Sequence, residues 1–193
     1  PELIARVAAA APGVRLCFVP KSGKDSAPLR DGSVDLETGV VSRTTAPELR
    51  VQALFRDRLI GVVRIGHALS QGEITPERYA AGRHLCVSRR GLVQGPIDEA
   101  LKLLGLEREV VTIVSGFATA LAFARVSDLI ASVPERHTDS LRAGMHAFSL
   151  PIATPAITVS LHWHPRMDAD PAHRWLRGCV RAVCAAAVAD ASR

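Results

Sequence analysis

Five residues close to the C-terminus are of the types that bind metal ions, and they fall within residues 162–173: His162, His164, Asp168, Asp170 and His173. Imidazole nitrogens and carboxylate oxygens are zinc ligands, and two histidines two residues apart share one face of a strand. Asp170, however, directly precedes Pro171, which is the order expected where a carboxylate caps a helix. Because a metal site also needs its ligands to converge, we predict that these residues bind no metal.

Three turns that follow predicted strands hold polar and glycine residues, and such turns are the second place where chemistry could occur. They contain Ser22 and Gly23; Ser88, Arg89 and Gln94; and Ser115, Gly116 and Phe117. Ligands of open α/β sheets bind at the carboxyl ends of strands, where helix N-termini present free N–H groups to anions. The same residue types also occur at such turns merely because they cap helices, and Arg89 beside Arg90 is typical of a solvated charge pair.

Enzymatic motifs are absent from the sequence. It contains no GxSxG, phosphate-binding GxxxxGK[ST], GxGxxG or HExxH pattern. The few lysines, Lys21, Lys24 and Lys102, have no evident catalytic partner. We therefore predict that the chain is not an enzyme and needs no cofactor.

The hydrophobic pattern predicts alternating strands and helices, which would place these residues. Ile157, Val159, Leu161 and Trp163 alternate as in a strand, and the helix that opens at Pro171 would turn Trp175, Cys179, Val183 and Val188 to one face. Further predicted strands are 14–18, 34–41, 49–55, 59–65, 84–87, 110–114 and 129–133, and predicted helices are 3–11, a short piece ending at Gly32, another opening at Thr75, 96–104 and 117–124. Such alternation predicts parallel sheets covered by helices.

Composition is that of a soluble globular protein: 193 residues, 48% hydrophobic and 22% charged. The formal charge of +5 is spread along the chain without a basic run, so direct binding of nucleic acid is not expected. No apolar run is long enough for a membrane span, and no signal-peptide pattern follows Pro1, so we expect a cytoplasmic location. The four cysteines lack CxxC spacing and are interpreted as buried free thiols.

Four segments together resemble the effector-binding domain of the LysR-type transcriptional regulators. They are Leu-Arg-Asp-Gly-Ser-Val-Asp-Leu-Glu-Thr-Gly at 29–39, Gly-His-Ala-Leu at 66–69, Ser-Asp-Leu-Ile-Ala-Ser-Val-Pro at 127–134, and the closing segment 163–177. The resemblance implies an α/β fold of two Rossmann-like subdomains with a central cleft, like the type 2 periplasmic binding proteins. It implies subdomain I at 1–66 plus 152–193 and subdomain II at 67–151. The family's winged helix-turn-helix and the domain's first strand would precede Pro1.

The function implied by the resemblance is sensing. A small organic effector, with an anion favoured, would bind in the cleft through the three polar turns and bias an attached DNA-binding domain. DNA would be contacted only through that N-terminal domain, and no membrane would be involved. Some family members have a charged residue that contacts the effector at the position of Val40. The hydrophobic Val40 therefore argues against a second charged group that would bind a carboxylate of the effector. Alternatives are an exported solute-binding protein of a transport system and an enzyme on the same two-lobed fold.

Self-association as a homodimer or homotetramer is also implied by the resemblance. Family members pair antiparallel, which would place residues 3–18 of one subunit against residues 117–125 of another. A twofold interface uses each patch twice, so one introduced charge acts twice. On this basis, Val7→Asp is expected to weaken the dimer.

Overall fold

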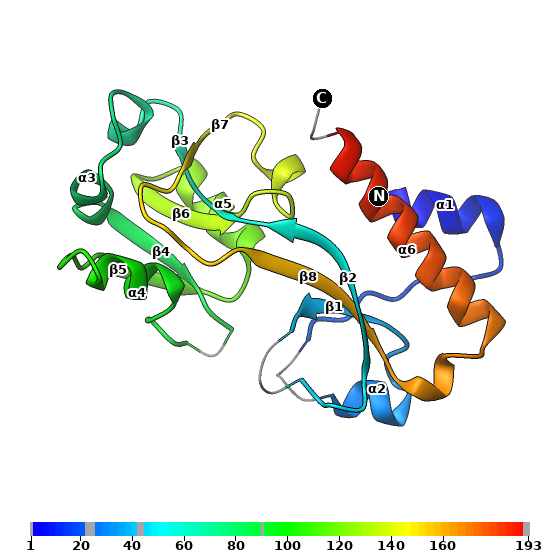
Figure 1. Ribbon diagram of the computed structural model, residues 1–193. Helices are drawn as coiled ribbons and strands as arrows, with labels where there is room; N and C mark the ends of the chain where they lie inside the picture. Colours follow the sequence, from blue (N-terminus) through cyan, green and yellow to red (C-terminus); the bar gives the residue numbers. More distant parts are fainter. Residues whose placement is uncertain (1, 22–25, 42–44, 90, 191–193) are drawn as a thin grey trace. The chain divides into compact units, whose positions relative to one another are not determined.

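The computed structural model describes residues 2–21, 26–41, 45–89 and 91–190, and the chain divides into two compact units (Figure 1). Unit 1 is formed by Pro1–Arg56 with Thr158–Arg193, and unit 2 by Asp57–Ile157. Each unit contains one β-sheet together with helices. The predicted α/β class is confirmed.

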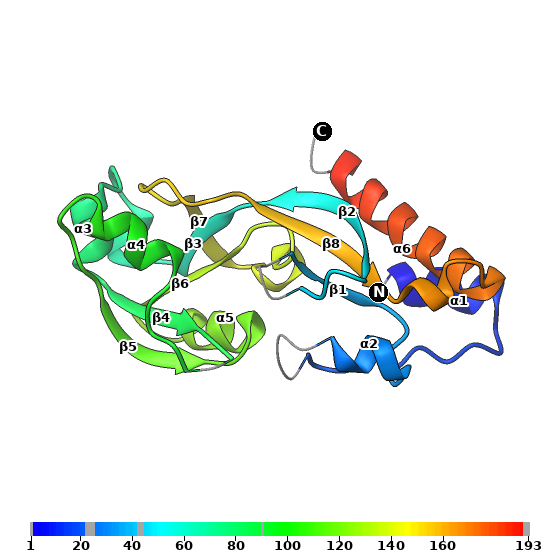
Figure 2. The same ribbon diagram turned by 60° about the horizontal axis from the view of Figure 1, so that its bottom comes forward.

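Unit 1 contains a three-stranded sheet and the two ends of the chain. Its sheet order is β1-β8-β2, and β1 runs antiparallel to β8. The helices α1 and α6 lie side by side, as both views of the ribbon show (Figure 2). The elements are α1 (Glu2–Ala10), α2 (Ala27–Asp31), β1 (Glu37–Val40), β2 (Arg50–Asp57), β8 (Ile157–Trp163) and α6 (Pro171–Asp190).

Unit 2 is built on a five-stranded mixed sheet of order β5-β4-β6-β3-β7. The strand β4 pairs in parallel with both β5 and β6, whereas β3 is antiparallel to β6 and β7. The predicted parallel pairing therefore holds for only part of this sheet, and β7 was not predicted. The elements are β3 (Leu59–Arg64), α3 (Pro76–Ala80), β4 (Arg83–Val87), α4 (Pro96–Lys102), β5 (Glu109–Val114), α5 (Phe117–Arg125), β6 (Leu129–Pro134) and β7 (Met145–Ser149).

Helices cover both faces of the unit 2 sheet. One face packs against α5, whose Ala120, Leu121 and Ala124 are buried with Val62 and Ala131. The other face packs against α3 and α4. Consecutive strand residues therefore enter opposite cores: Val62 belongs to the first and Val63 to the second. This two-sided burial explains why the strands of unit 2 read as nearly continuous apolar runs.

The two units divide at different residues from those that the resemblance implies. Subdomain II was expected to begin at residue 67 and to end at 151, but β3 forms hydrogen-bonded ladders with β6 and β7 and so lies in unit 2. The division falls between Arg56 and Asp57, and again between Ile157 and Thr158. Hydrophobic pattern alone does not reveal which sheet a strand joins, because that depends on pairing partners.

Three further expectations from the sequence are wrong in detail. Residues 14–18 form no strand, and Phe18 is 69% exposed. Trp175 of α6 is exposed, whereas Cys179 of the same predicted face is buried, together with His173, Arg177 and Val180. Of the cysteines, Cys179 is buried, Cys86 and Cys184 are half-buried, and Cys17 is exposed.

Among the described helices, none is both long and apolar enough to cross a membrane.

A buried histidine makes the stability of unit 2 depend on pH. His84 Nε2 bonds to the Tyr79 carbonyl at 2.8 Å, and burial is the main cause that lowers the pKa of His84 from 6.5 to about 4. Between these values the unfolded chain binds a proton that the folded chain does not, so stability is lost as the pH falls.

We expect the free energy of unfolding to drop by about 2 kcal/mol through His84 between pH 7 and pH 5, and His84→Gln to remove this part of the slope. Urea unfolding at the two pH values measures it. His162, whose pKa burial also lowers, contributes to the slope that remains. His137→Gln, at an exposed histidine, is the matched control. If His84→Gln leaves the pH dependence of the unfolding free energy unchanged, that dependence does not come from His84.

Candidate functional site

Three polar turns of unit 2 lie at one edge of its sheet. Because β5, β4 and β6 are neighbouring parallel strands, their carboxyl ends meet at the same edge. This edge holds Ser88 after β4, Ser115–Phe117 after β5, and residues 135–138 after β6. We call these residues the carboxyl edge of unit 2.

Ser88 and Ser115 are neighbours across the β4–β5 ladder. The Ser88 N–H donates to the Val114 carbonyl at 2.8 Å, which extends the ladder beyond Val87. The Ser88 hydroxyl accepts a hydrogen bond of 2.9 Å from the Leu92 N–H and thereby shapes the following turn. Arg89 is exposed. The structure therefore brings two of the predicted turns together.

The turn before α5 leaves the start of that helix without a side-chain cap. Its N-cap residue is Gly116, the second residue of the predicted turn. Ser115 is exposed, and a Cβ atom added to Gly116 would meet nothing within 4 Å. The first N–H groups of a helix have no intrahelical partner. The carboxyl edge thus combines bare helix N–H groups, an exposed hydroxyl and the half-buried ring of Phe117.

His137 is a residue of this edge that the sequence interpretation missed. Its ring lies edge-on to Phe117, with ring centroids 5.8 Å apart. His137 is exposed and comes three residues after β6 ends. The signal that could have revealed it is position: it follows a parallel strand, as Ser88 and Ser115 do.

Gln94 lies in a different depression from the other predicted ligand residues. It lines a pocket of about 570 Å³ along α4 and β5, together with Asp98, Lys102 and Arg108. The Asp98 carboxylate binds Arg108 Nε at 2.8 Å and also accepts from the Gly95 N–H. Burial raises the pKa of Asp98, but the hydrogen bonds and charge of Arg108 outweigh it and lower that pKa. The charged groups of Asp98 and Arg108 thus bind each other and the start of α4, which are structural roles.

Ser22 and Gly23, predicted to contact the effector from unit 1, lie outside the described residues. Lys21, just before them, forms an ion pair with Glu37, and His162 Nδ1 lies 3.6 Å from the same carboxylate oxygen. Burial lowers the pKa of His162, with the charge of Glu37 acting in the opposite direction.

Comparison with known proteins identifies the family. The family model of the LysR substrate binding domain matches residues 1–185. The chain belongs to this family. SyrM, a transcriptional regulator of Rhizobium meliloti, is 30% identical over 97% of the chain, and the transcriptional activator NagR of a Ralstonia species is 27% identical over 92%. The chain spans 58% of SyrM and 60% of NagR.

Solved structures agree with this membership. The regulatory domain of MexT, a transcriptional activator of Pseudomonas aeruginosa, superimposes with a TM-score of 0.79 at 27% identity, covering 94% of the chain and 88% of MexT's. The effector-binding domain of QuiR, in complex with shikimate, has the same fold, with a TM-score of 0.71, 15% identity and coverage of 95% and 88%. The chain is an effector-binding regulatory domain of the LysR family, which consists of regulators and not of enzymes. The transport and enzyme alternatives are thereby disfavoured.

The closing segment that resembles this LysR family forms a network of hydrogen bonds. Asp168 accepts hydrogen bonds from Trp163 Nε1 at 2.6 Å and from Arg50 Nε at 2.9 Å, and Arg50 is the main cause that lowers its pKa. Asp170 accepts from the His173 N–H at 2.6 Å, which confirms it as the cap of α6. Within the described part of the chain, no group of three or more His, Cys, Asp or Glu residues is arranged to hold a metal ion.

Arg166 and Arg177 complete this network by binding backbone carbonyls. Arg166 donates to the carbonyls of Leu29 and Arg30 at the end of α2, beside Gly32 with φ of 85°. A side chain at Gly32 would be strained at this φ and would also collide with Arg166, 2.6 Å from its Cβ. Arg177 donates to the Met167 and Asp168 carbonyls and lies 4.7 Å from the centre of the Trp163 ring.

We expect Arg177→Met to lower the free energy of unfolding by about 2–4 kcal/mol, because it leaves two carbonyls of the closing turn without their donor and removes the cation over Trp163. Arg174→Met, at an exposed position of the same helix, is the control and should change it by less than about 0.5 kcal/mol. Urea unfolding followed by tryptophan fluorescence compares the two. Equal midpoints for both variants would show that the network adds no stability.

Proposed function

We propose that this domain senses a small organic effector that binds at the carboxyl edge of unit 2. The observation that carries the proposal is that three turns at the ends of parallel strands gather a hydroxyl, bare helix N–H groups and two aromatic rings. Polar groups converging beside an apolar wall are what small-molecule sites commonly have. The sequence also predicts Ser22 and Gly23 as effector contacts.

An anionic effector fits this edge best. The N-terminal end of α5 carries partial positive charge and unpaired N–H groups, and both favour a carboxylate. Phe117 and His137 offer ring surfaces to an apolar or aromatic body. A small organic acid combines both features, and shikimate, which QuiR binds, is one such compound.

Regulation by this effector would act on a part of the protein beyond the present chain. The curated relatives are transcriptional regulators that are considerably longer than the stretch matched here. We propose that effector binding changes the relative populations of conformations of the two units and that an attached DNA-binding domain responds to this change. DNA contact would then belong to that other domain.

The effector site can be tested at Ser115. Ser115→Phe should abolish binding because it fills the edge, whereas Ser115→Ala should weaken it about fivefold, as expected for the loss of one neutral hydrogen bond. NMR titration of the Gly116 and Phe117 amides with small organic acids, beginning with shikimate and benzoate, measures both. Undiminished affinity in Ser115→Phe would place the effector elsewhere.

We further propose that two exposed apolar helix faces form a dimer interface, in the antiparallel pairing expected of the family. On α1, Ile4 is 53% exposed. Phe123 of α5 and Val126, which directly follows this helix, are 45% and 79% exposed. Val7 was a wrong choice for testing this interface: it is 1% exposed and belongs to the core of unit 1, so a charge there would unfold the unit.

Phe123→Asp is therefore expected to shift a dimer toward monomer at constant fold, because each interface would contain the new carboxylate twice. Light scattering over a concentration series measures the mass, and circular dichroism checks the fold. Leu103→Asp, at an exposed leucine outside both helix faces, is the control. If both variants keep the mass of the wild type, these faces do not form the interface.

A further inference from the structure

The carboxylate of Asp57 lies where the chain passes from unit 1 to unit 2. Asp57 is the last residue of β2 and the first residue of unit 2, and only Arg58 separates it from β3. A charged side chain at such a position is usually solvated, yet Asp57 is only 5% exposed. Its burial therefore requires specific partners.

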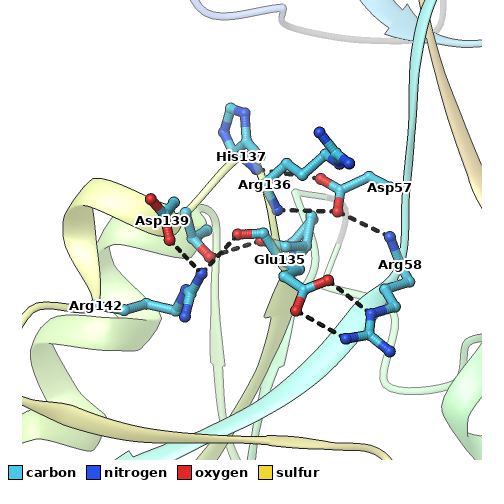
Figure 3. A network of polar contacts seen from close by, with 9 residues as sticks. Asp57, Arg58, Glu135, Arg136, His137, Asp139 and Arg142 are labelled. Atoms are coloured by element: carbon cyan, nitrogen blue, oxygen red, sulfur yellow. Dashed lines mark hydrogen bonds and ion pairs between the residues drawn. The ribbon is translucent and has the colours of Figure 1, made fainter. Parts of the chain in front are cut away.

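Three backbone N–H groups are those partners. Asp57 Oδ1 accepts from Arg58 at 2.8 Å and from Arg136 at 3.0 Å, and Oδ2 accepts from His137 at 3.1 Å (Figure 3). Hydrogen bonds to an ionised carboxylate are about twice as strong as neutral ones. One side chain at the junction of the units thus fixes two consecutive amides of the loop that follows β6.

The same loop is held at its other residues as well. Arg58 binds the Glu135 carboxylate through two nitrogens, at 2.6 and 2.9 Å, and these hydrogen bonds are the main cause that lowers the pKa of Glu135. Arg142 donates to the Glu135 carbonyl, and the buried Thr138 hydroxyl donates to the Pro134 carbonyl at 2.6 Å. The loop of residues 135–138 is therefore a fixed platform for the ring of His137.

That ring contacts Phe117, the first residue of α5. A continuous chain of contacts thus runs from one of the two places where the chain passes between the units, through the Asp57 carboxylate and the His137 backbone, to the edge where we place the effector. Coupling between sites is carried by contiguous packed and hydrogen-bonded groups of this kind.

We propose that Asp57 is a positioning residue that couples the carboxyl edge of unit 2 to the chain segment joining the two units. An effector that displaces Phe117 or His137 changes the hydrogen bonds that the Arg136 and His137 amides make to Asp57, and the connection at Arg58 responds. The inference rests on the effector function proposed above. It specifies how a structural change caused by effector binding at the carboxyl edge reaches the junction at Arg58.

The coupling can be tested without any effector, by amide hydrogen exchange of the 193-residue chain measured by NMR. Asp57→Asn keeps the shape but replaces one acceptor oxygen by a donor, so exchange at Arg136 and His137 should rise about tenfold relative to the Val62 amide of the core. Glu135→Gln, which weakens only the exposed ion pair with Arg58, is the matched control and should change these rates less than about threefold. No rise in Asp57→Asn overturns the proposal.

The second experiment changes a residue of the carboxyl edge and measures the response of the backbone amides at the junction. Phe117→Leu removes the ring but keeps an apolar side chain, and it should shift the Arg58 amide resonance and raise exchange at His137. Phe123→Leu, the same change on an exposed face of the same helix, should do neither. In an Asp57→Asn background, Phe117→Leu should no longer affect Arg58.

If Phe117→Leu leaves the Arg58 amide resonance unchanged in the wild-type background, Asp57 only caps the loop locally. This outcome would not depend on the identity of the effector. Failure of shikimate and benzoate to perturb Gly116 or Phe117 would instead count against the proposed effector class. The two failures are therefore distinguishable. If Asp57→Asn does not fold, Phe117→Leu alone still decides whether the junction responds.

Discussion

Parallel pairing of β4 with two neighbours is the constraint on which the proposed effector site depends. Parallel strands need crossover connections, and here α4 and α5 provide them while covering opposite faces of the sheet. The geometry has one consequence for function: every turn after β4, β5 or β6 opens at the same edge. Ser88, Ser115 and His137, distant in the sequence, become neighbours because their strands run in one direction.

Carboxylates in this chain stabilise turns and helix ends. Asp57, Asp98 and Asp170 each accept backbone N–H groups at a turn or helix start. Arg166 and Arg177 do the complementary task and donate to free carbonyls. Buried backbone groups without partners are costly, so side chains that satisfy them define the loop conformations. This explains why residues that resemble a metal site, His173 and Asp170 among them, are structural.

The two units use these devices differently. In unit 1 the closing segment binds α2 and the start of β2 to α6, so the polar network stabilises the unit itself. In unit 2 the network around Asp57 lies beside the carboxyl edge and includes the residue at which the chain enters the unit. The same physical rule, a charged side chain that satisfies backbone groups of a loop, therefore stabilises the closing segment in one unit and fixes the loop beside the carboxyl edge in the other.

Local patterns in the sequence were enough to predict most elements, because the energies that decide them are local. Pro171 after Asp170 predicted the start of α6, Thr75 before Pro76 the start of α3, and alternation at 157–163 the strand β8. The fold class followed from their order. The positions of Ser88 and Ser115 at the ends of strands also followed from local rules, since both come after apolar segments that end in polar turns.

Only the tertiary structure decided which partners these elements take. The inclusion of β3 in unit 2, the exposure of Phe18 and the inward face of α6 depend on pairing and packing between distant residues, which periodicity does not encode. The same holds for Gln94, which lines a pocket with Asp98 and Arg108, and for His137, which strand order brings to Phe117. The sequence determined what each segment is, whereas long-range hydrogen bonds and burial determined what each side chain meets.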